Sequence, residues 1–421
     1  MASNRWKYHQ PSGGRTTMST SLMYHAFGLT GFDYVRQSFV AGNIIFDVRP
    51  KPKLVRCPEC KSQEVVRRGS FERWLRTVPI GFKPVWLCVE APRVECRKCG
   101  CVRRIDLKIA EPRRWYTRAF ERFALALTKM MTMLDASALL GIGWDGIKSI
   151  FKRHLQRRFG NPSLSGLKYI AIDEISVRKG HKYLTLVMDL ESGAIVFVGD
   201  GKGAEALDPF WKRLKRSSAM VQAVATDLSI AYISAVMTHL PGVPLVFDHF
   251  HVVKLMNDKL TEIRRKIFQE LENMPGREVL KGSRWILLKN PENLNKKRNE
   301  PERLKEALRF NEPLATAYYM KEDLRQIWSQ SDKAKAFVFL DDWIARATTS
   351  GIGPLVKMGN TMVKFRFGIL AWYDHPISSS PMEGSNNKIK TMKRQAYGYR
   401  DKEFFKLRIM GIHESRFILT G

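Results

Sequence analysis

The stretch Tyr169-Ile-Ala-Ile-Asp-Glu-Ile-Ser-Val177 decides the fold expected for this chain. It is an apolar run of the length and composition typical of a buried strand, with two acidic residues near its middle. Alternating apolar runs, helical periodicities and turn residues follow it along the chain. The expected elements are strands at 183–189 and 194–199, a helix at 204–214, a strand at 221–226, a helix at 230–240 and a strand at 244–247.

This order, three strands and then helix, strand, helix, strand, is that of a ribonuclease-H-like domain. Asp173 lies in the first strand and Asp227 directly follows the fourth, and we expect these strands to be parallel neighbours. Two adjacent carboxylates repel each other unless cations lie between them. Mg²⁺ binds a few carboxylates together with water and phosphate oxygens, so we expect two Mg²⁺ or Mn²⁺ ions here. The alternative is that each aspartate is an ordinary turn or cap residue.

A third acid of such a site is harder to identify from the residues alone. Glu174 adjoins Asp173 and therefore points to the opposite face of the sheet. Asp248 follows the fifth strand and is equally suited to capping a helix. Glu383 follows Pro381, where a helix is expected to begin, and precedes a run of amide and basic residues suited to phosphate. The DNA-contacting residues expected in this run are Asn386, Lys388, Lys390, Lys393 and Arg394.

All six cysteines of the chain lie between Cys57 and Cys101. Two C-x-x-C pairs, Cys57 with Cys60 and Cys96 with Cys99, have the spacing that lets one tight turn present two thiolates to a tetrahedral Zn²⁺. The 35 residues between the pairs alternate as strands do, so extra hairpins fill the gap. We therefore predict a zinc ribbon with one structural Zn²⁺, against the alternative of buried or redox cysteines. Cys88 is expected in the core of a strand, and no role is assigned to Cys101.

A helix-turn-helix is expected after the ribbon. Apolar periodicity predicts a helix from Trp115 to about Met133, a short helix from an Asp135 cap to a Gly141 stop, and a helix over 144–159. The last helix is basic on its polar face, which is the pattern of a DNA-recognition helix, although an ordinary helical hairpin has the same periodicity. The DNA-contacting residues expected on this helix are Lys148, Lys152, Arg153 and Arg157.

The charge of the chain supports a polyanionic partner. The 421 residues carry 71 Lys and Arg against 41 Asp and Glu, a net charge of +30, and neutralised phosphates release counterions. Residues 1–168 hold 31 basic and 12 acidic residues, so the front of the chain is the more cationic part. Basic ribosomal, membrane-surface and cytosolic proteins share this composition. No run reaches the length of a membrane span, and we expect a cytoplasmic protein at the bacterial nucleoid.

The combined motifs resemble the ISL-three family of bacterial insertion-sequence transposases, a group of the DDE class. The similar stretches are both C-x-x-C pairs and residues 171–183, 225–229, 247–255, 382–390 and 393–400. The resemblance implies that Asp173, Asp227 and Glu383 form the catalytic triad and hold the catalytic ions. It also implies that the ribbon and the helix-turn-helix bind the inverted-repeat ends of the element.

The predicted fold class is an α+β multidomain protein: a zinc ribbon, a helix-turn-helix and a ribonuclease-H-like domain interrupted by a helical insertion. The 155 residues between Asp227 and Glu383 exceed what such a domain needs, which predicts the insertion. The expected divisions are a leader over 1–24, the zinc-ribbon domain over 25–110, the helix-turn-helix over 111–162, the catalytic domain over 167–274 and 366–421, and the insertion over 275–365.

The predicted function is cleavage of double-stranded DNA at element ends and transfer of the freed 3′ end to target DNA. A homodimer is expected on paired ends. Two other functions suit the same residues: a ribonuclease-H-like nuclease or resolvase, which cuts without joining, and a non-catalytic DNA-binding regulator, which does neither. Two roles suit Trp285, Trp328, Trp343 and Trp372: stacking on unpaired bases near the cleavage point, or filling a core, which is the more common role of such residues.

Overall fold

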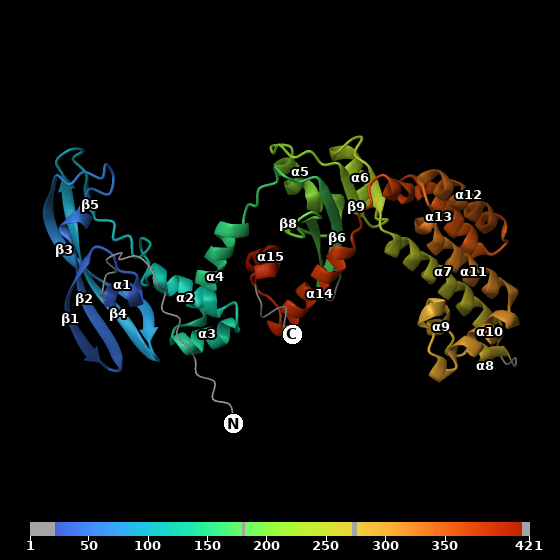
Figure 1. Ribbon diagram of the computed structural model, residues 1–421, viewed down its shortest axis with the longest axis horizontal. Coiled ribbons are helices and arrows are strands. Elements are labelled where there is room, and N and C mark those ends of the chain that lie inside the picture. Colours follow the sequence, from blue (N-terminus) through green and yellow to red (C-terminus); the bar gives the residue numbers. More distant parts are fainter. Residues whose placement is uncertain (1–21, 179–181, 272–275, 415–421) are drawn as a thin grey trace, which may run out of the picture. The chain divides into compact units, whose positions relative to one another are not determined.

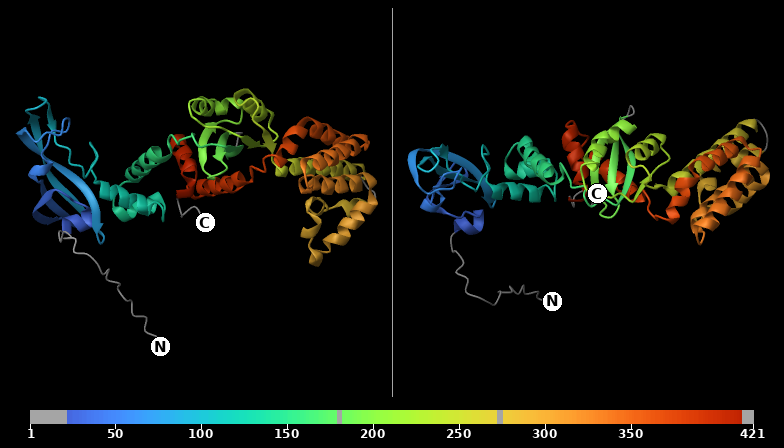
Figure 2. Two further views of the ribbon diagram at one scale, coloured as in Figure 1. Left: turned by 45° about the horizontal axis from the view of Figure 1, so that its top comes forward. Right: turned by 90° about the horizontal axis from the view of Figure 1, so that it is seen from above.

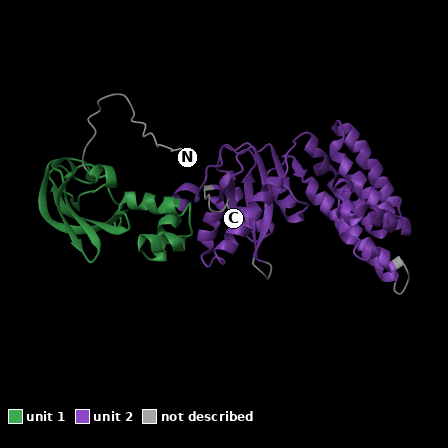
Figure 3. Ribbon diagram, turned by 60° about the horizontal axis from the view of Figure 1, so that its bottom comes forward, with its two compact units in different colours: residues 1–154, 415–417 green, residues 155–414, 418–421 purple. Residues whose placement is uncertain are grey.

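The computed structural model describes residues 22–178, 182–271 and 276–414. These residues fall into two compact units, residues 22–154 and residues 155–414 (Figure 3). Residues 1–21 of the leader expected over 1–24 lie outside the described residues. So do residue 275, where the insertion is expected to begin, and residues 415–421 of the expected catalytic domain. No helix within the described part of the chain is long and apolar enough to cross a membrane.

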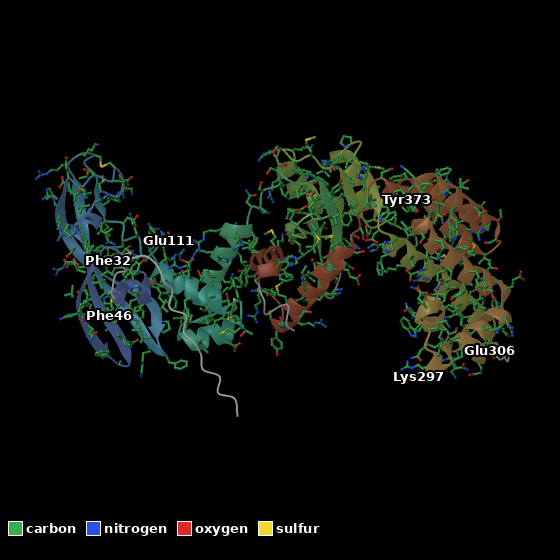
Figure 4. All side chains as sticks on the ribbon, viewed as in Figure 1. Phe32, Phe46, Glu111, Lys297, Glu306 and Tyr373 are labelled. Atoms are coloured by element: carbon green, nitrogen blue, oxygen red, sulfur yellow. The ribbon has the colours of Figure 1, made fainter. Side chains whose placement is uncertain are left out.

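The first unit begins with a five-stranded sheet in the order β1-β2-β4-β3, with β5 paired to β4 (Figure 1). A long hairpin of β3 and β4 dominates it, and β2 runs parallel to β4. Phe32 and Phe46, labelled in Figure 4, are buried in the core of this sheet with Leu75 and Leu87. The elements are α1 (Leu22–Phe27), β1 (Phe32–Val40), β2 (Asn43–Pro50), η1 (Pro52–Leu54), β3 (Val65–Ile80), β4 (Lys83–Cys96) and β5 (Val102–Arg104).

Three helices follow the sheet: α2 (Arg118–Leu127), α3 (Met133–Leu140) and α4 (Trp144–Phe159). The predicted first helix is wrong in its bounds, because Thr117 caps α2 through the Phe120 N–H at 3.1 Å and the helix ends at Leu127. The predicted Asp135 cap is also wrong. Thr132 caps α3 and Asp135 completes the capping box from inside the helix. The stop at Gly141, with φ +62°, and the bounds of α4 are confirmed.

The second unit contains the sheet that the sequence predicts, in the order β10-β9-β6-β7-β8. The predicted succession of strands and helices is confirmed, except that the first helix divides into a 3₁₀ turn and a shorter α-helix. The elements are β6 (Tyr169–Arg178), β7 (Lys182–Asp189), β8 (Ile195–Asp200), η2 (Ala204–Leu207), α5 (Asp208–Leu214), β9 (Ala223–Thr226), α6 (Ile230–His239) and β10 (Leu245–Phe247).

Helices cover both faces of this sheet (Figures 1 and 2). Ile170 and Ile172 of β6 pack in the core that includes α5 and α6. Ala171 and Ile175 pack in a separate core with α14 (Ser380–Gln395) and α15 (Lys402–Met410). Successive strand residues point to opposite faces, so Asp173 belongs to the α14 face and Glu174 to the α6 face.

A helical region separates Asp227 from α14, as the long gap predicts. Its core is continuous with the α6 side of the sheet. A Cβ on Gly368 would lie 2.4 Å from the Phe247 ring of β10, so glycine lets α13 lie directly on the sheet. The helices of this region are α7 (His249–Glu270), α8 (Gly276–Leu280), α9 (Arg284–Leu288), α10 (Glu300–Phe310), α11 (Glu312–Arg325), α12 (Lys333–Thr349) and α13 (Gly353–Leu370), with short turns η3 (Pro291–Asn293), η4 (Lys296–Arg298), η5 (Gln326–Ser329) and η6 (Ala371–Tyr373). A last short turn, η7 (Ile412–Glu414), follows α15.

The bounds predicted for the insertion, residues 275 and 365, lie among these helices. α13 passes through residue 365, where the insertion was expected to end, and α7 begins before residue 275. Trp343 is fully buried and its indole N–H donates to the Met320 carbonyl at 2.8 Å, so it is a core residue. Trp285, by contrast, is 66% exposed.

Candidate active site

Parallel pairing of β6 with β9 brings Asp173 and Asp227 to one place at the edge of the sheet. Ile172 pairs with Thr226, and each aspartate directly follows one member of this pair. Asp173 and Asp227 therefore lie side by side. Asp227 directly follows β9 and accepts a hydrogen bond from the Ser229 N–H at 3.0 Å, just before α6 begins. Both aspartates are half-buried, so they are reachable from solvent without being fully hydrated.

The surroundings of Asp173 disfavour its charge. Burial raises the pKa of Asp173, and the negative charge of Asp227 raises it further. The amide of Asn386, the Glu174 N–H and the His251 ring act in the opposite direction without cancelling the effect. A cation between the two carboxylates would remove this penalty, and carboxylate oxygens are ligands that Mg²⁺ prefers. The residues present therefore fit a divalent metal.

Helix α14 reaches the same edge through Asn386. Its side-chain Nδ2 donates to Asp173 Oδ2 at 2.8 Å, and the residue is only 9% exposed. The Asn386 Oδ1 atom is buried and has no hydrogen-bond partner among the residues that the structure describes. The sequence predicts Asn386 as a DNA contact, and in the structure its amide is directed at the Asp173 carboxylate.

Glu383 lies on α14 three residues before Asn386, which places the two on the same side of the helix. Its side chain is exposed and makes no hydrogen bond or ion pair with the described residues. In the described residues the three predicted acids do not each place an oxygen within 4.8 Å of the other two. The structure thus brings the helix of Glu383 to the aspartates and leaves the carboxylate itself free in solvent.

Asp248 fixes the start of α14, a role that no local sequence pattern predicts. It is 2% exposed, directly follows β10 and caps α7 through the Phe250 N–H at 2.9 Å. Its Oδ2 atom accepts hydrogen bonds from the Ser378 and Ser379 hydroxyls, each at 2.8 Å. Burial opposes ionisation, but these hydrogen bonds outweigh it and hold the pKa of Asp248 below its ordinary value. The signal in the sequence was a serine run just before Pro381.

Glu174 lies on the opposite face, as strand alternation predicts. Burial raises its pKa, with Asp227 and Asp173 adding to the effect, and the Tyr232 hydroxyl is a hydrogen-bond partner. Tyr232 is also 3.0 Å from the Thr185 hydroxyl. This acid belongs to a polar cluster beneath α6.

The basic residues of α14 stay available to a ligand. Lys388, Lys390, Lys393 and Arg394 are half-buried or exposed, and none forms an ion pair with the described residues. These residues follow Glu383 along α14 by about one to three turns. On α4, Arg153 is turned toward α2, where it lies 3.7 Å from Glu121 and contacts the Tyr116 hydroxyl. Lys148 lies over the Trp144 ring at 5.3 Å; Lys152 is half-buried and Arg157 exposed.

The cysteine pairs meet in the first unit. The sulfurs of Cys57, Cys60, Cys96 and Cys99 all lie within 4.8 Å of one another. The Cys57–Cys99 distance is 3.6 Å and the Cys60–Cys96 distance 3.5 Å, close to the roughly 3.7 Å between thiolates of a tetrahedral zinc site. Pairing of Val65 with Cys96 in the β3–β4 hairpin brings the two turns together. The four predicted residues therefore fit a structural Zn²⁺.

Two further cysteines lie in the same unit. Cys101 is 3.2 Å from Cys57 and so adjoins the thiol group without belonging to the set of four. Cys88 is 7% exposed in β4, paired across the hairpin with Trp74, and is a strand core residue as expected.

Comparisons with known proteins match both units. A family described as a transposase matches residues 170–409, a zinc finger of the transposases IS204, IS1001, IS1096 and IS1165 matches residues 53–99, and a helix-turn-helix domain of transposase family ISL3 matches residues 105–155. The chain is 33% identical over 371 residues to the transposase for insertion sequence element IS1001 of Bordetella parapertussis, covering 86% of this chain and 89% of that protein. It is 28% identical over 389 residues to the transposase for insertion sequence element IS1557 of Mycobacterium tuberculosis (strain CDC 1551 / Oshkosh), covering 86% of each.

Proposed function

The chain belongs to the ISL3 family of insertion-sequence transposases, and from this premise we propose that Asp173, Asp227 and Glu383 form its catalytic site. The observation that carries the proposal is the hydrogen bond from Asn386 of α14 to Asp173, beside Asp227. It joins the helix of the third acid to the two strands of the other acids. The site would act on DNA at the element ends and on target DNA.

The three carboxylates would hold two Mg²⁺ or Mn²⁺ ions. Such a pair of ions lowers the pKa of an attacking hydroxyl and stabilises the leaving oxygen of the phosphodiester. Asn386 keeps the Asp173 carboxylate in one orientation, and Asp248 fixes the serine segment from which α14 starts. Glu383, free in solvent, would turn toward the aspartates when DNA and ions bind.

The cations of α14 would hold the DNA backbone beside the acids. Lys388, Lys390, Lys393 and Arg394 follow Glu383 on one helix and have no carboxylate partner in the described residues. Each neutralised phosphate releases counterions and strengthens binding at low salt. The helix-turn-helix and the ribbon would recognise the terminal repeats, with α4 as the recognition helix, and a homodimer at the nucleoid would hold two ends together.

The proposal is tested by mapping cuts in a duplex that carries one element end, with Mg²⁺ and the full chain. The wild type should free a 3′ hydroxyl at the end and join it to target DNA. Glu383→Gln should lose both reactions, while Asp208→Asn, an exposed acid on α5, should keep them. Cutting without joining would favour a nuclease or resolvase, and binding without cutting a DNA-binding regulator. Cleavage by Glu383→Gln at the wild-type rate would remove Glu383 from the site.

A further inference from the structure

Four arginines gather on three consecutive helices of the helical region. Arg264 and Arg265 lie on α7, Arg277 on α8 and Arg284 on α9. The guanidinium groups of Arg264 and Arg277 lie 5.8 Å and 4.9 Å from the centroid of the Phe268 ring. This set is called the arginine surface below.

A flat aromatic ring borders the arginine surface. The guanidinium of Arg284 lies 4.8 Å from the centroid of the Trp285 ring, and Trp285 is 66% exposed. One guanidinium group can bind two phosphate oxygens at once. An exposed indole ring offers a face on which a base can stack. Cations and an aromatic ring side by side suit a nucleic acid better than a free anion.

Acidic residues near these helices neutralise lysines instead. Glu262 pairs with Lys259 at 3.2 Å, and Glu278 pairs with Lys281 at 3.7 Å. Glu270 likewise pairs with Lys266 at 3.9 Å. No carboxylate lies within 4.0 Å of any member of the arginine surface among residues 22–178, 182–271 and 276–414. The surface therefore keeps its full charge although acids are present nearby.

The free protein leaves hydrogen-bonding groups of this surface without partners. The Nε atoms of Arg264 and Arg284 are buried and have no hydrogen-bond partner in the described residues. Burial lowers the pKa of Arg264, and the charges of Arg265 and Arg284 lower it further, so these groups repel one another. A half-buried charge without a partner is costly, and an anion from outside would relieve both the repulsion and the missing hydrogen bonds.

Other arginines of the same region are neutralised. Arg346 of α12 pairs with Asp323 at 2.7 Å and Asp342 at 2.9 Å. Arg366 of α13 pairs with Asp341 at 2.5 Å. The helical region thus contains two classes of arginine, one used within the fold and one left without acids.

We infer that the arginine surface binds DNA phosphates, as a contact separate from α4 and from the basic run of α14. The inference rests on the proposed function, since it takes DNA to be the substrate. The helical region then does more than fill the space between Asp227 and Glu383. It holds a second stretch of the DNA whose cleavage the acids carry out, with Trp285 against an exposed base.

The test compares two double variants of the full chain that remove equal charge. Arg264→Gln with Arg284→Gln changes the arginine surface, and Arg346→Gln with Arg366→Gln changes the paired class. Binding to a duplex with one element end is measured by fluorescence anisotropy over a series of salt concentrations without Mg²⁺. Loss of two phosphate contacts should reduce the slope of log affinity against log salt by about 1.8 in the first variant. The second variant should keep the wild-type slope.

A second double variant of the arginine surface is used in case the protein with Arg264 and Arg284 substituted does not fold. Arg265→Gln with Arg277→Gln alters the same surface and should reduce the slope by a similar amount. Unchanged slopes in both surface variants, or equal reductions in surface and paired variants, would overturn the inference. A wild-type protein that fails to bind the duplex would contradict the proposed function itself, whereas normal binding with unchanged slopes contradicts only the arginine surface.

Discussion

The thiol group of the ribbon and the carboxylate edge of the second sheet are both suited to metal ions, yet they are built in different ways. The four thiols come from two tight turns at the end of one hairpin, and the register of β3 with β4 closes the group. The acids come from β6, the end of β9 and α14, with 155 residues between the second and third. The first group is local to one hairpin, and the second depends on the packing of a whole unit.

This difference shows in how complete each group is without its ion. The thiols already lie at distances suited to Zn²⁺. At the carboxylate edge two acids are fixed by strand pairing, while Glu383 stays exposed on a helix that Asn386 and Asp248 hold in place. A structural metal needs a closed set of ligands, whereas a catalytic metal needs open positions for substrate.

The largest effect is expected from changing Asp173, which should abolish DNA cleavage without affecting the thiol group of the ribbon. Asp173→Asn should reduce strand cleavage at least about 1,000-fold, roughly 4 kcal/mol of transition-state stabilisation, and leave the zinc content unchanged. Because the fold raises the pKa of Asp173, the ionised group destabilises the metal-free protein at neutral pH. The variant should therefore melt at a higher temperature than the wild type without Mg²⁺, and the difference should shrink as the pH falls. A variant that still cleaves, or that melts lower, would contradict the assignment of Asp173.

Removing a thiol should affect the first unit. Cys60→Ser should lose the bound zinc and with it several kcal/mol of stability of the ribbon, since binding energy of a structural zinc is folding energy. The measurements are zinc per chain by elemental analysis and thermal unfolding. Cys88→Ser, a buried strand position outside the group, should keep its zinc. Equal zinc loss in both variants would show that the two positions do not differ as proposed.

A smaller effect is expected where the carboxylate edge is held together. Asp248→Asn weakens the acceptor of three hydrogen bonds and should lower stability by about 1–3 kcal/mol, with an additional loss of cleavage because the start of α14 is no longer fixed. The fold lowers the pKa of Asp248, so its contribution is full above the ordinary aspartate pKa and is lost as the pH falls through the folded pKa. Denaturant unfolding at several pH values measures this.

The control for this prediction is Asp332, whose contacts are all local: it caps its own helix through the Lys335 N–H, accepts from the Ser331 hydroxyl at 2.8 Å and pairs with the Lys335 ammonium at 3.6 Å. Asp332→Asn should give a smaller loss of stability and leave cleavage unchanged when the folded fractions are equal. If both variants lower cleavage equally, Asp248 has no role in positioning α14.

The smallest effect is expected at Cys101, which adjoins Cys57 at 3.2 Å. Cys101→Ser should keep its zinc with a change in affinity below about tenfold, as expected for a group next to the ligands. Cys99→Ser should lose it. Competition with a coloured zinc chelator measures both affinities, and the reverse result would make Cys101 the fourth ligand.

Much of the fold could be predicted because its strands and helices follow from patterns of a few neighbouring residues. The succession of β6 to β10 follows from apolar runs and turn residues, and α4 from its periodicity and from the glycine that stops α3. The helix bounds that were wrong depended on which of several cap residues is used. Thr132 and Asp135 are both good caps, and only the geometry of the capping box shows that Thr132 takes that place.

The environment of the site was not predictable in the same way. The position of Asn386 beside cations predicts a DNA contact, but no local pattern indicates that its amide donates to Asp173, 213 residues earlier. The bonds from Ser378 and Ser379 to Asp248 span 130 and 131 residues. Residues so far apart in the chain come together only through tertiary packing. The sequence pattern of one segment does not show which distant segment packs against it.

The sequence by itself determined the two thiol pairs that come together in the first unit and the order of strands that makes Asp173 and Asp227 neighbours. Ligand spacing and strand alternation act over a few residues, so they are legible along the chain. Only the tertiary structure decided that α14 is tied to β6 and β10, that Trp343 is buried while Trp285 is exposed, and that four arginines share a surface without acids. Each of these features depends on which helix and strand faces pack together across long stretches of chain. Burial and charge neutralisation result from that packing.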